Sequence, residues 1–448
     1  MTRPLRARMI LRAAAWTLAA LSALLVAAPA LAQQVAFEDV AANLKSPEPR
    51  VRLDALTLLR DAGYLEAAPA IAPLLSDPDD KVQAAAVEAV VSMYLVDERY
   101  TREYGKDLIR EKGATLPLYA FVQGPGATIP NLAPAAVIRG LMDAASSPNM
   151  RTRFDAAYAL AVVGRPLVLQ GQFPDGRVAA NRLVAILHEP DPLMRLAATH
   201  ALGRLMGAAN RNPTANPELT AQRVEVGDQI VVGMNDPDAD VRLSSMGALG
   251  EMRYDRGVQS LTDMFTYYKK GPEAMAALDA LAKIGHPGSL TVFLAQLGHR
   301  EAHVRRMAVE GIGRTGDKDA MAQMESRTSG DQSAFVTYAR AFARARNGDY
   351  SQLPKLVDGF KYSLLASDTF DYLVELGAPA ATELAAFSTD KDAKVRAGIA
   401  EVLGIIGSQQ TLGVIEVMMR DRSDLVAAAA ERSQKRLTPR AKALPRSR

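Results

Sequence analysis

The 448-residue chain contains no cysteine, a single tryptophan and only five histidines. Without cysteine it has no disulfide framework and no thiolate metal site. A bacterial lipid anchor, which needs a cysteine at the cleavage site, is excluded for the same reason. The scarcity of histidine leaves few candidate metal ligands, and the sequence predicts no cofactor.

Long apolar runs are also absent after residue 32. The apolar run "AAAWTLAALSALLVAA" near the start is shorter than the roughly 20 residues that a membrane span needs. It follows four arginines and precedes Ala30-Leu31-Ala32, an arrangement typical of a secretory signal peptide. We expect residues 1–32 to be cleaved, no membrane-spanning segment thereafter, and a periplasmic or secreted protein. A retained membrane anchor is the alternative.

The body of the chain lacks an excess of positive charge. The formal net charge of +3 includes the four arginines before residue 13, so the chain from residue 33 is near −1. The stretch 433–448 holds six basic residues and no acid, which leaves the body near −7. A nucleic-acid-binding face is therefore not expected. The tail 433–448 is predicted to be disordered and to contact anionic components of the envelope.

Seven segments share one pattern, in which a polar starter residue stands six positions before an anchor residue. The clearest copy is "NDPDADVRLSSMGALGEM", residues 235–252. The starters are Ser46, Asp77, Ser147, Glu189, Asp236, His299 and Asp390, and the anchors are Arg52, Gln83, Arg153, Arg195, Arg242, Arg305 and Arg396. Because Ser and Asp are preferred N-caps and proline follows most starters, each starter is predicted to cap a helix.

Each predicted helix has one packing face. A small residue stands three positions after the anchor in most copies, and an apolar residue stands seven positions after it in every copy. Gly63, Gly164, Gly316 and Gly407 are expected to end helices in the left-handed conformation. Weaker copies and shorter apolar helices fill the gaps with a period of about 31 residues. The sequence therefore predicts an all-α fold, an α-solenoid of about ten or eleven helix pairs.

This pattern resembles that of HEAT-repeat proteins, specifically the subclass named after phycobilisome bilin lyases. The likeness lies in the Asp-Pro-Asp start, the Val-Arg pair and the Ala-Leu-Gly trio of residues 236–250, and it extends over about residues 35–432. The resemblance implies a ladder of hydrogen bonds between starter acids and anchor arginines. Its candidate members are Asp236 with Arg242, Glu189 with Arg195, Asp390 with Arg396, and also Arg52, Arg153 and Arg305. Gln83 and the non-acidic starters predict an incomplete ladder.

The repeats at 33–95 and 135–432 are interrupted by an insertion at 96–134 and by loops at 165–177 and 208–228. All three interruptions begin after a capped helix, so we expect them at one edge of the solenoid, where partners often bind. The alternative is that edge loops lengthen freely, because closure entropy rises slowly with length.

Six side chains are candidate contacts for a protein partner: Tyr100, Tyr104, Tyr119 and Phe121 in the insertion, and Arg340 and Arg344 in a basic stripe. The aromatic residues could equally anchor the insertion to the core. The arginines could belong to an ordinary polar helix face.

Few residues suggest chemistry. The alternating acids Asp236, Asp238 and Asp240 look like the start of a calcium loop, but the sixth and twelfth positions lack the required glycine and glutamate. His299 and His303, four residues apart, are weak metal-ligand candidates. No catalytic constellation is recognisable, and we do not expect an enzyme.

We therefore expect an exported scaffold or adaptor that binds proteins through a curved inner surface, with specificity from the loops of the first half. A bilin-lyase-like enzyme or enzyme accessory is the alternative, and a small-ligand or metal carrier with a cleft beneath the long insertion is a third hypothesis.

Overall fold

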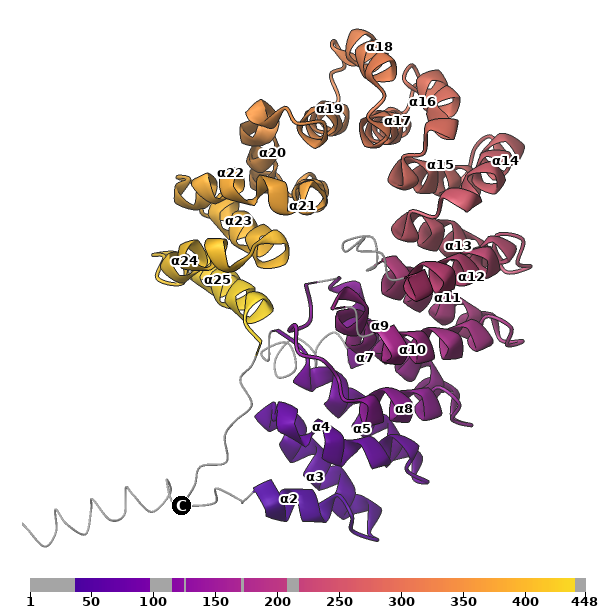
Figure 1. Ribbon diagram of the computed structural model, residues 1–448, viewed down its shortest axis with the longest axis vertical. Coiled ribbons are helices and arrows are strands. Elements are labelled where there is room, and N and C mark those ends of the chain that lie inside the picture. Colours follow the sequence, from indigo (N-terminus) through magenta and orange to yellow (C-terminus); the bar gives the residue numbers. More distant parts are fainter. Residues whose placement is uncertain (1–36, 97–114, 125, 171–172, 208–216, 440–448) are drawn as a thin grey trace, which may run out of the picture.

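The computed structural model describes residues 37–96, 115–124, 126–170, 173–207 and 217–439. Within these residues helices follow one another as eleven pairs, and the one β-interaction is an isolated bridge between Leu95 and Thr128. The predicted all-α solenoid is confirmed (Figure 1).

The pairs, in chain order, are α2 (Phe37–Asn43) with α3 (Pro49–Ala62), α4 (Ala68–Ile71) with α5 (Asp80–Met93), α8 (Ala135–Ala144) with α9 (Met150–Leu169), α10 (Phe173–Ile186) with α11 (Pro192–Gly207), α12 (Pro217–Gly233) with α13 (Ala239–Met252), and α14 (Val258–Tyr268) with α15 (Pro272–Ile284). They continue as α16 (Leu290–Gln296) with α17 (Ala302–Thr315), α18 (Lys318–Thr328) with α19 (Ala334–Arg346), α20 (Leu353–Asp358) with α21 (Ala366–Leu376), α22 (Ala381–Ala385) with α23 (Ala393–Ile406), and α24 (Gln409–Met418) with α25 (Asp424–Leu437). An additional helix, α7 (Leu116–Val122), stands between the second and third pairs.

The second helix of each pair forms the inner layer. In Figure 1 α13, α15, α17, α23 and α25 lie toward the inside of the curve, whereas α14, α16, α18 and α24 lie on its outside. The chain curls so far that its last helix returns to the segment around α7. The molecule is thus a nearly closed ring rather than an open arc.

Small residues allow the inner helices to approach closely. In the Ala-Leu-Gly trio, the glycine faces the next inner helix: a Cβ on Gly250 would lie 3.0 Å from the Cα of Ala280, and one on Gly313 would lie 2.5 Å from the Cβ of Ala343. The residues predicted for the packing face, three and seven positions after each anchor, are all buried. The small residues let neighbouring inner helices lie closer together than larger residues would permit. The stack therefore curves toward its inner layer.

The predicted N-caps are displaced by two residues. The cap of α13 is Asp238, whose carboxylate accepts hydrogen bonds from the amides of Asp240 and Val241. Asp236 instead accepts a bond from the amide of Asp238 and thereby closes the turn before the helix. The prediction that starters cap helices is therefore wrong for this copy, because the proline after the starter lies in that turn and not in the helix.

Two of the predicted helix-ending glycines are also in other conformations. Gly63 and Gly316 have φ values of 62° and 69° and end α3 and α17 as expected. Gly164 lies inside α9, which continues through Pro166, and Gly407 has φ −72°. The left-handed helix end predicted at these two positions is therefore wrong.

The expected loops are shorter than predicted. Most of 165–177 is helical, because α9 extends to Leu169 and α10 begins at Phe173. In the loop predicted at 208–228, residues 208–216 lie outside the described residues and the remainder belongs to α12. The tail predicted from residue 433 begins within α25, which ends at Leu437.

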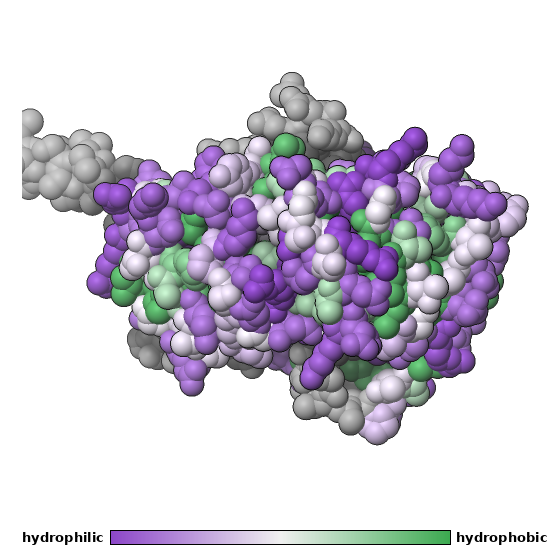
Figure 2. All heavy atoms as spheres, turned by 90° about the horizontal axis from the view of Figure 1, so that it is seen from above, coloured by the Kyte–Doolittle hydropathy of each residue, from purple (hydrophilic) through white to green (hydrophobic). Residues whose placement is uncertain are grey.

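No helix in the described part of the chain combines the length and apolarity needed to cross a bilayer. Figure 2 shows the face seen from above, on which apolar residues form small groups separated by hydrophilic ones.

Candidate binding site at the seam between the two ends of the solenoid

The described part of the insertion is tied to the second helix pair by main-chain hydrogen bonds. The amide of Val96 donates to the carbonyl of Ala127 at 2.9 Å, and the amide of Ile129 donates to that of Tyr94 at 2.9 Å. Tyr94 and Ile129 are fully buried. The two ends of the insertion are therefore held together, and α7 lies between them in sequence.

The last helix meets this segment and closes the ring. Lys435 Nζ donates to the carbonyl of Val96 at 3.2 Å, and Arg436 Nε donates to the carbonyl of Gly126 at 2.6 Å. These residues are more than 300 positions apart in sequence. We call this contact between α25 and residues 94–96 and 126–129 the seam. Two of the basic residues assigned to a disordered tail thus have a structural role, while residues 440–448 lie outside the described residues.

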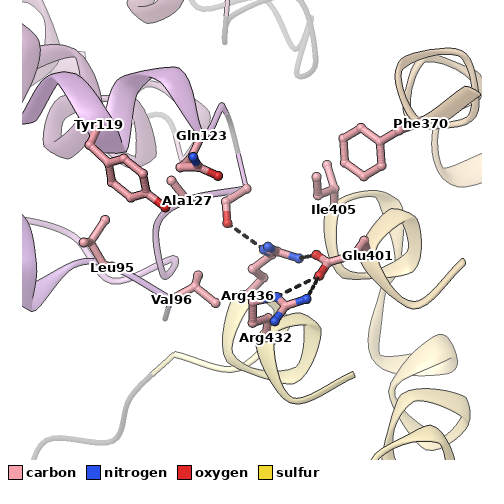
Figure 3. Close-up of a pocket in the computed structure, with 11 residues that line it drawn as sticks. Leu95, Val96, Tyr119, Gln123, Ala127, Phe370, Glu401, Ile405, Arg432 and Arg436 are labelled. Atoms are coloured by element: carbon pink, nitrogen blue, oxygen red, sulfur yellow. Dashed lines mark hydrogen bonds and ion pairs between the residues drawn. The ribbon is translucent and has the colours of Figure 1, made fainter. Parts of the chain in front are cut away.

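A cavity of about 250 Å³ opens at the seam (Figure 3). On one side Leu95, Val96, Tyr119 and Ala127 come from the insertion and the helix before it. The opposite side is formed by side chains of α21, α23 and α25. Neither end of the solenoid forms this cavity alone.

Charged side chains line the second side. Arg432 donates from Nε and Nη2 to Glu401 Oε1, at 2.7 and 2.5 Å, and Arg436 donates to Glu401 Oε2. The side chains of Arg436, Arg432 and Glu401 are 12, 21 and 21% exposed. Phe370 and Ile405 complete this side with apolar surface, as Figure 3 shows. Two guanidinium groups therefore share one carboxylate at the border of an apolar cavity.

The repeat register explains where these charges lie. Ala427 occupies the anchor position in α25, and Arg432 and Arg436 stand five and nine positions after it. Glu401 and Ile405 stand at the same distances after the anchor Arg396 in α23. The corresponding residues of α17 are Glu310 and Arg314, and those of α11 are His200 and Arg204. Our sequence interpretation missed these two sets of residues, which stand five and nine positions after the anchors. Their signal was available as polar residues at i and i+4 on otherwise apolar helices.

Charged residues at these positions also form ion pairs across the interior of the ring. Glu375 of α21 accepts from Arg314 of α17 at 3.0 Å, and lies 2.7 Å from the guanidinium of Arg253, which follows α13. Arg346 adds a third cation at 3.5 Å. Burial opposes ionisation, yet the charges of Arg314 and Arg253 lower the pKa of Glu375 to about 2. The inner charges of the second half are therefore engaged with one another.

The predicted ladder exists, but it pairs each anchor with the next repeat. Arg195 donates to both carboxylate oxygens of Asp236 at 2.8 Å and to its own starter's carbonyl, that of Glu189, at 3.1 Å. Arg242 likewise donates to the carbonyl of Asp236 at 2.9 Å and contacts Glu273 at 3.1 Å. The expected pairing of Asp236 carboxylate with Arg242 is wrong, because the arginine reaches forward along the stack.

Other rungs follow the same rule. Arg52 pairs with Asp77, Arg153 with Glu189, Arg305 with Asp331 and Arg396 with Asp421, and Arg396 also donates to the carbonyl of Asp390. At the rung expected to be missing, Gln83 donates to the carbonyl of Leu75 and accepts from Ser147 at 2.8 Å each. A neutral pair thus replaces the ion pair there.

The aromatic candidates of the insertion anchor it to the core. Tyr119 is buried. The Phe121 ring lies edge-on to Tyr158 at 4.9 Å, and the guanidinium of Arg204 stands 4.3 Å above it. Tyr100 and Tyr104 lie outside the described residues. Anchoring of the insertion to the core, the alternative expected for Tyr119 and Phe121, therefore accounts for both side chains.

The remaining candidates also have local partners. Arg340 binds Glu325 and Arg344 binds Asp349. His299 Nδ1 accepts from the amide of Glu301 at 3.1 Å, whereas the His303 ring lies 4.7 Å from that of Phe335. Among the described residues no three metal-binding side chains gather.

Comparison with known protein families identifies part of the helical stack. Residues 273–343 match the family model of HEAT repeats. This part of the chain consists of HEAT repeats. The match covers the units α15–α19 of the regular second half, and it confirms the family predicted from the starter, anchor and glycine pattern. Comparison with curated proteins gives no match.

Solved structures with a similar course of the chain include several helical-repeat proteins. An engineered protein is 15% identical with a TM-score of 0.41, over 89% of this chain and 98% of that one. Importin beta is 15% identical with a TM-score of 0.37, over 89% and 55%. The complex of CpcE and CpcF of phycocyanin lyase from Nostoc sp. PCC7120 is 16% identical with a TM-score of 0.37, over 58% and 94%.

Proposed function

We propose that this HEAT-repeat protein is an exported scaffold that mediates protein–protein interaction in the bacterial cell envelope, without a reaction of its own. The observation that carries the proposal is the continuous stack of helix pairs, of which residues 273–343 match HEAT repeats. In a solenoid each unit contacts only its neighbours, so the chain presents an extended surface for partners.

Exposed apolar side chains on the outer layer favour a binding surface there. Val232, Tyr267 and Val417 are 67, 78 and 74% exposed, and each stands one residue before the end of an outer helix. Val232 and Tyr267 belong to successive pairs. Apolar residues rimmed by polar ones are typical of interaction surfaces, whereas the inner charges of the second half bind one another. We therefore propose a partner surface at the ends of α12 and α14 of the outer layer, in place of the inner surface expected from the sequence.

The test is crosslinking of the full exported chain in living cells, followed by mass spectrometry. The double variant Val232→Ser, Tyr267→Ser is expected to weaken the affinity for the partner at least about a hundredfold and so to deplete the crosslinked partners, because the two apolar side chains together contribute roughly 3–6 kcal/mol. Leu364→Ser is the matched control, since Leu364 is 80% exposed but lies outside the outer helices. Equal capture by both variants would contradict this surface. A chromophore co-purifying at one equivalent would instead favour the lyase-like alternative.

Export is supported by the signal-like sequence of residues 1–32, which lie outside the described residues. The protein recovered from the envelope or the medium is expected to begin at Gln33. Edman sequencing or intact mass measures this, with Ala32→Lys as the variant in which cleavage should fail. Recovery of the chain in the cytoplasm with residues 1–32 retained is the contrary outcome.

A further inference from the structure

A groove opens at the edge of the last two helix pairs, along which the ladder runs. Its volume is about 620 Å³. It is lined by residues 388–391 and 420–422, which belong to the turns before α23 and α25, by the anchor Arg396, and by side chains of α24. It shares no lining residue with the cavity at the seam. Two successive units of the stack therefore form this groove together.

The outer helix α24 supplies an apolar strip to the groove. Val414 is partly buried and Met418 is buried, whereas Val417 is 74% exposed. Val417 stands ten positions before Ala427, the residue in the anchor position of its unit, and Val232 stands ten positions before the anchor Arg242. The strip therefore presents apolar surface to solvent at a defined register position.

Positive charge borders this strip. Four cationic and two acidic residues line the groove, so its formal charge is +2. Arg396 belongs to the ladder, where it donates to both carboxylate oxygens of Asp421 at 2.8 Å. The other three cations, Lys391, Arg420 and Arg422, are exposed, and in the described part of the chain none of them forms an ion pair. The groove thus offers cations that the fold does not use.

The repeat register explains why these cations gather here. The position directly after the starter is proline in the five copies before residue 250, but it is Arg300, Lys391 and Arg422 in three later units. Lys391 and Arg422 belong to successive units, whose helices lie roughly 8–10 Å apart. The repeat itself therefore places two cations beside one another along the groove.

We propose that this groove binds a short acidic segment of a partner protein. Carboxylates of the segment contact Lys391, Arg420 and Arg422, and its aliphatic side chains cover Val414 and Val417. Charge complementarity selects the acidic segment and excludes basic ones. An extended chain advances about 3.3 Å per residue, so carboxylates two or three residues apart reach cations in neighbouring units.

A membrane surface fits this groove less well than a peptide does, because the apolar strip lines a recess that a flat bilayer does not enter. The groove is separate from the partner surface at the ends of α12 and α14. It therefore goes beyond the scaffold function proposed above, and either site can fail its test while the other passes.

The probe is the blocked hexapeptide Glu-Leu-Glu-Glu-Leu-Glu, titrated by calorimetry into the full chain. It is expected to bind with a Kd on the order of 10–100 μM. The same peptide with glutamine for glutamate should bind at least about tenfold more weakly, and the one with serine for leucine at least about fivefold more weakly. Raising the salt from about 0.05 to about 0.5 M should weaken binding, because exposed charges are screened.

Charge reversal separates recognition from folding. The double variant Arg420→Glu, Arg422→Glu is expected to bind the acidic peptide at least about tenfold more weakly and to gain binding of the blocked peptide Lys-Leu-Lys-Lys-Leu-Lys. An unfolded variant would bind neither peptide. Arg300→Glu is the matched control, since Arg300 occupies the register position of Arg422 and its side chain is 89% exposed. It should leave the affinity unchanged.

The apolar strip has its own matched pair. Val417→Ser is expected to weaken binding of the acidic peptide at least about fivefold, whereas Val232→Ser, at the same register position of α12, should not change it. Loss of crosslinked partners in the Val232 variant with intact peptide binding separates this groove from the surface at α12 and α14.

The proposal is overturned by absence of binding at about 1 mM peptide, by equal affinity for the glutamate and glutamine peptides, or by failure of the charge-reversed variant to exchange one peptide for the other. Binding to phosphatidylglycerol vesicles without peptide binding overturns it in favour of a membrane surface. Self-association that the same variants abolish, again without peptide binding, overturns it in favour of a second copy of this chain.

Discussion

Buried ionisable residues in this protein stabilise or strain the fold, and they offer a sharp test at the level of single side chains. Asp155 of α9 is 3% exposed and accepts a hydrogen bond from the Thr115 hydroxyl. Burial raises the pKa of Asp155 from its usual 3.8 to about 6, against the lowering effect of the Thr115 bond. At neutral pH the molecule therefore carries a desolvated carboxylate next to the start of α7.

Asp155→Asn is expected to stabilise the protein at neutral pH. Because the folded-state pKa of Asp155 is raised, its contribution to folding stability is complete below about pH 4 and is lost as the pH rises through about 6. The variant should raise the free energy of unfolding by about 1–3 kcal/mol at pH 7.5 and change little at pH 4. Urea denaturation at both pH values measures this, with the exposed Asp240→Asn as control. A destabilised variant at pH 7.5 would refute the assignment.

A second residue-scale prediction concerns the ladder. Arg195 holds the carboxylate of Asp236 with two bonds and the carbonyls of its own turn with others. Lysine cannot reproduce this fork. Arg195→Lys is expected to lower the free energy of unfolding by about 1–3 kcal/mol, whereas Arg300→Lys, at a side chain 89% exposed, should have almost no effect. Equal urea midpoints for the two variants would show that the ladder contributes nothing.

At the scale of the helices, the closeness of the inner layer depends on glycine. Glycine normally weakens a helix interior, yet Gly203, Gly250, Gly313 and Gly404 recur at one register position. The neighbouring helix occupies the space of the missing Cβ at each of them. Packing between elements therefore outweighs helix propensity at this position.

Two glycine substitutions should have opposite effects. A Cβ on Gly313 would meet Ala343 at 2.5 Å, whereas one on Gly247 would meet nothing within 4 Å. Gly313→Ala is expected to destabilise by about 1–3 kcal/mol through overpacking, and Gly247→Ala to stabilise by up to about 1 kcal/mol through helix propensity. Thermal unfolding followed by circular dichroism measures both. Stabilisation by Gly313→Ala would mean that α17 and α19 are not closely packed.

For the whole molecule, ion pairs across the interior link helices that are distant in sequence. Glu375 alone connects α21 with the ends of α13, α17 and α19. Together with the seam, these pairs turn an arc into a nearly closed ring (Figure 1). A solenoid would otherwise have contacts only between neighbouring units.

Removing this carboxylate should loosen the ring. Glu375→Gln removes one of the two carboxylates that bind the buried Arg314, the other being that of Glu310. The variant is expected to cost about 3–5 kcal/mol and to have a larger radius of gyration in small-angle scattering. Because the pKa of Glu375 is lowered to about 2, its contribution is present above about pH 4.5 and is lost as the pH falls through 2. The two proteins should therefore converge in strong acid. The exposed Glu383→Gln is the control, and an unchanged radius would contradict a closing role.

Much of the architecture followed from periodicity. The anchors, the small residues three positions on and the apolar residues seven positions on predicted the helices, their packing face and the HEAT family. Gln83 was predicted to break the ladder, but its neutral pair with Ser147 shows that hydrogen-bonding capacity and not charge defines a rung. The sequence could not predict whether an anchor arginine pairs with the starter acid of its own repeat or with that of the next repeat. Both acids are compatible with the spacing, and only the stacking of the units decides between them.

The sequence by itself determined the local units, since helix propensity, turn chemistry and a packing face are encoded within about 31 residues. Only the tertiary structure decided that the units close into a ring. Closure depends on the small rotation between successive units, which accumulates along the stack, and on contacts such as Arg436 with Gly126 that join residues 310 positions apart. The cavity at the seam belongs to this second level, because each of its walls is complete only when the other is present.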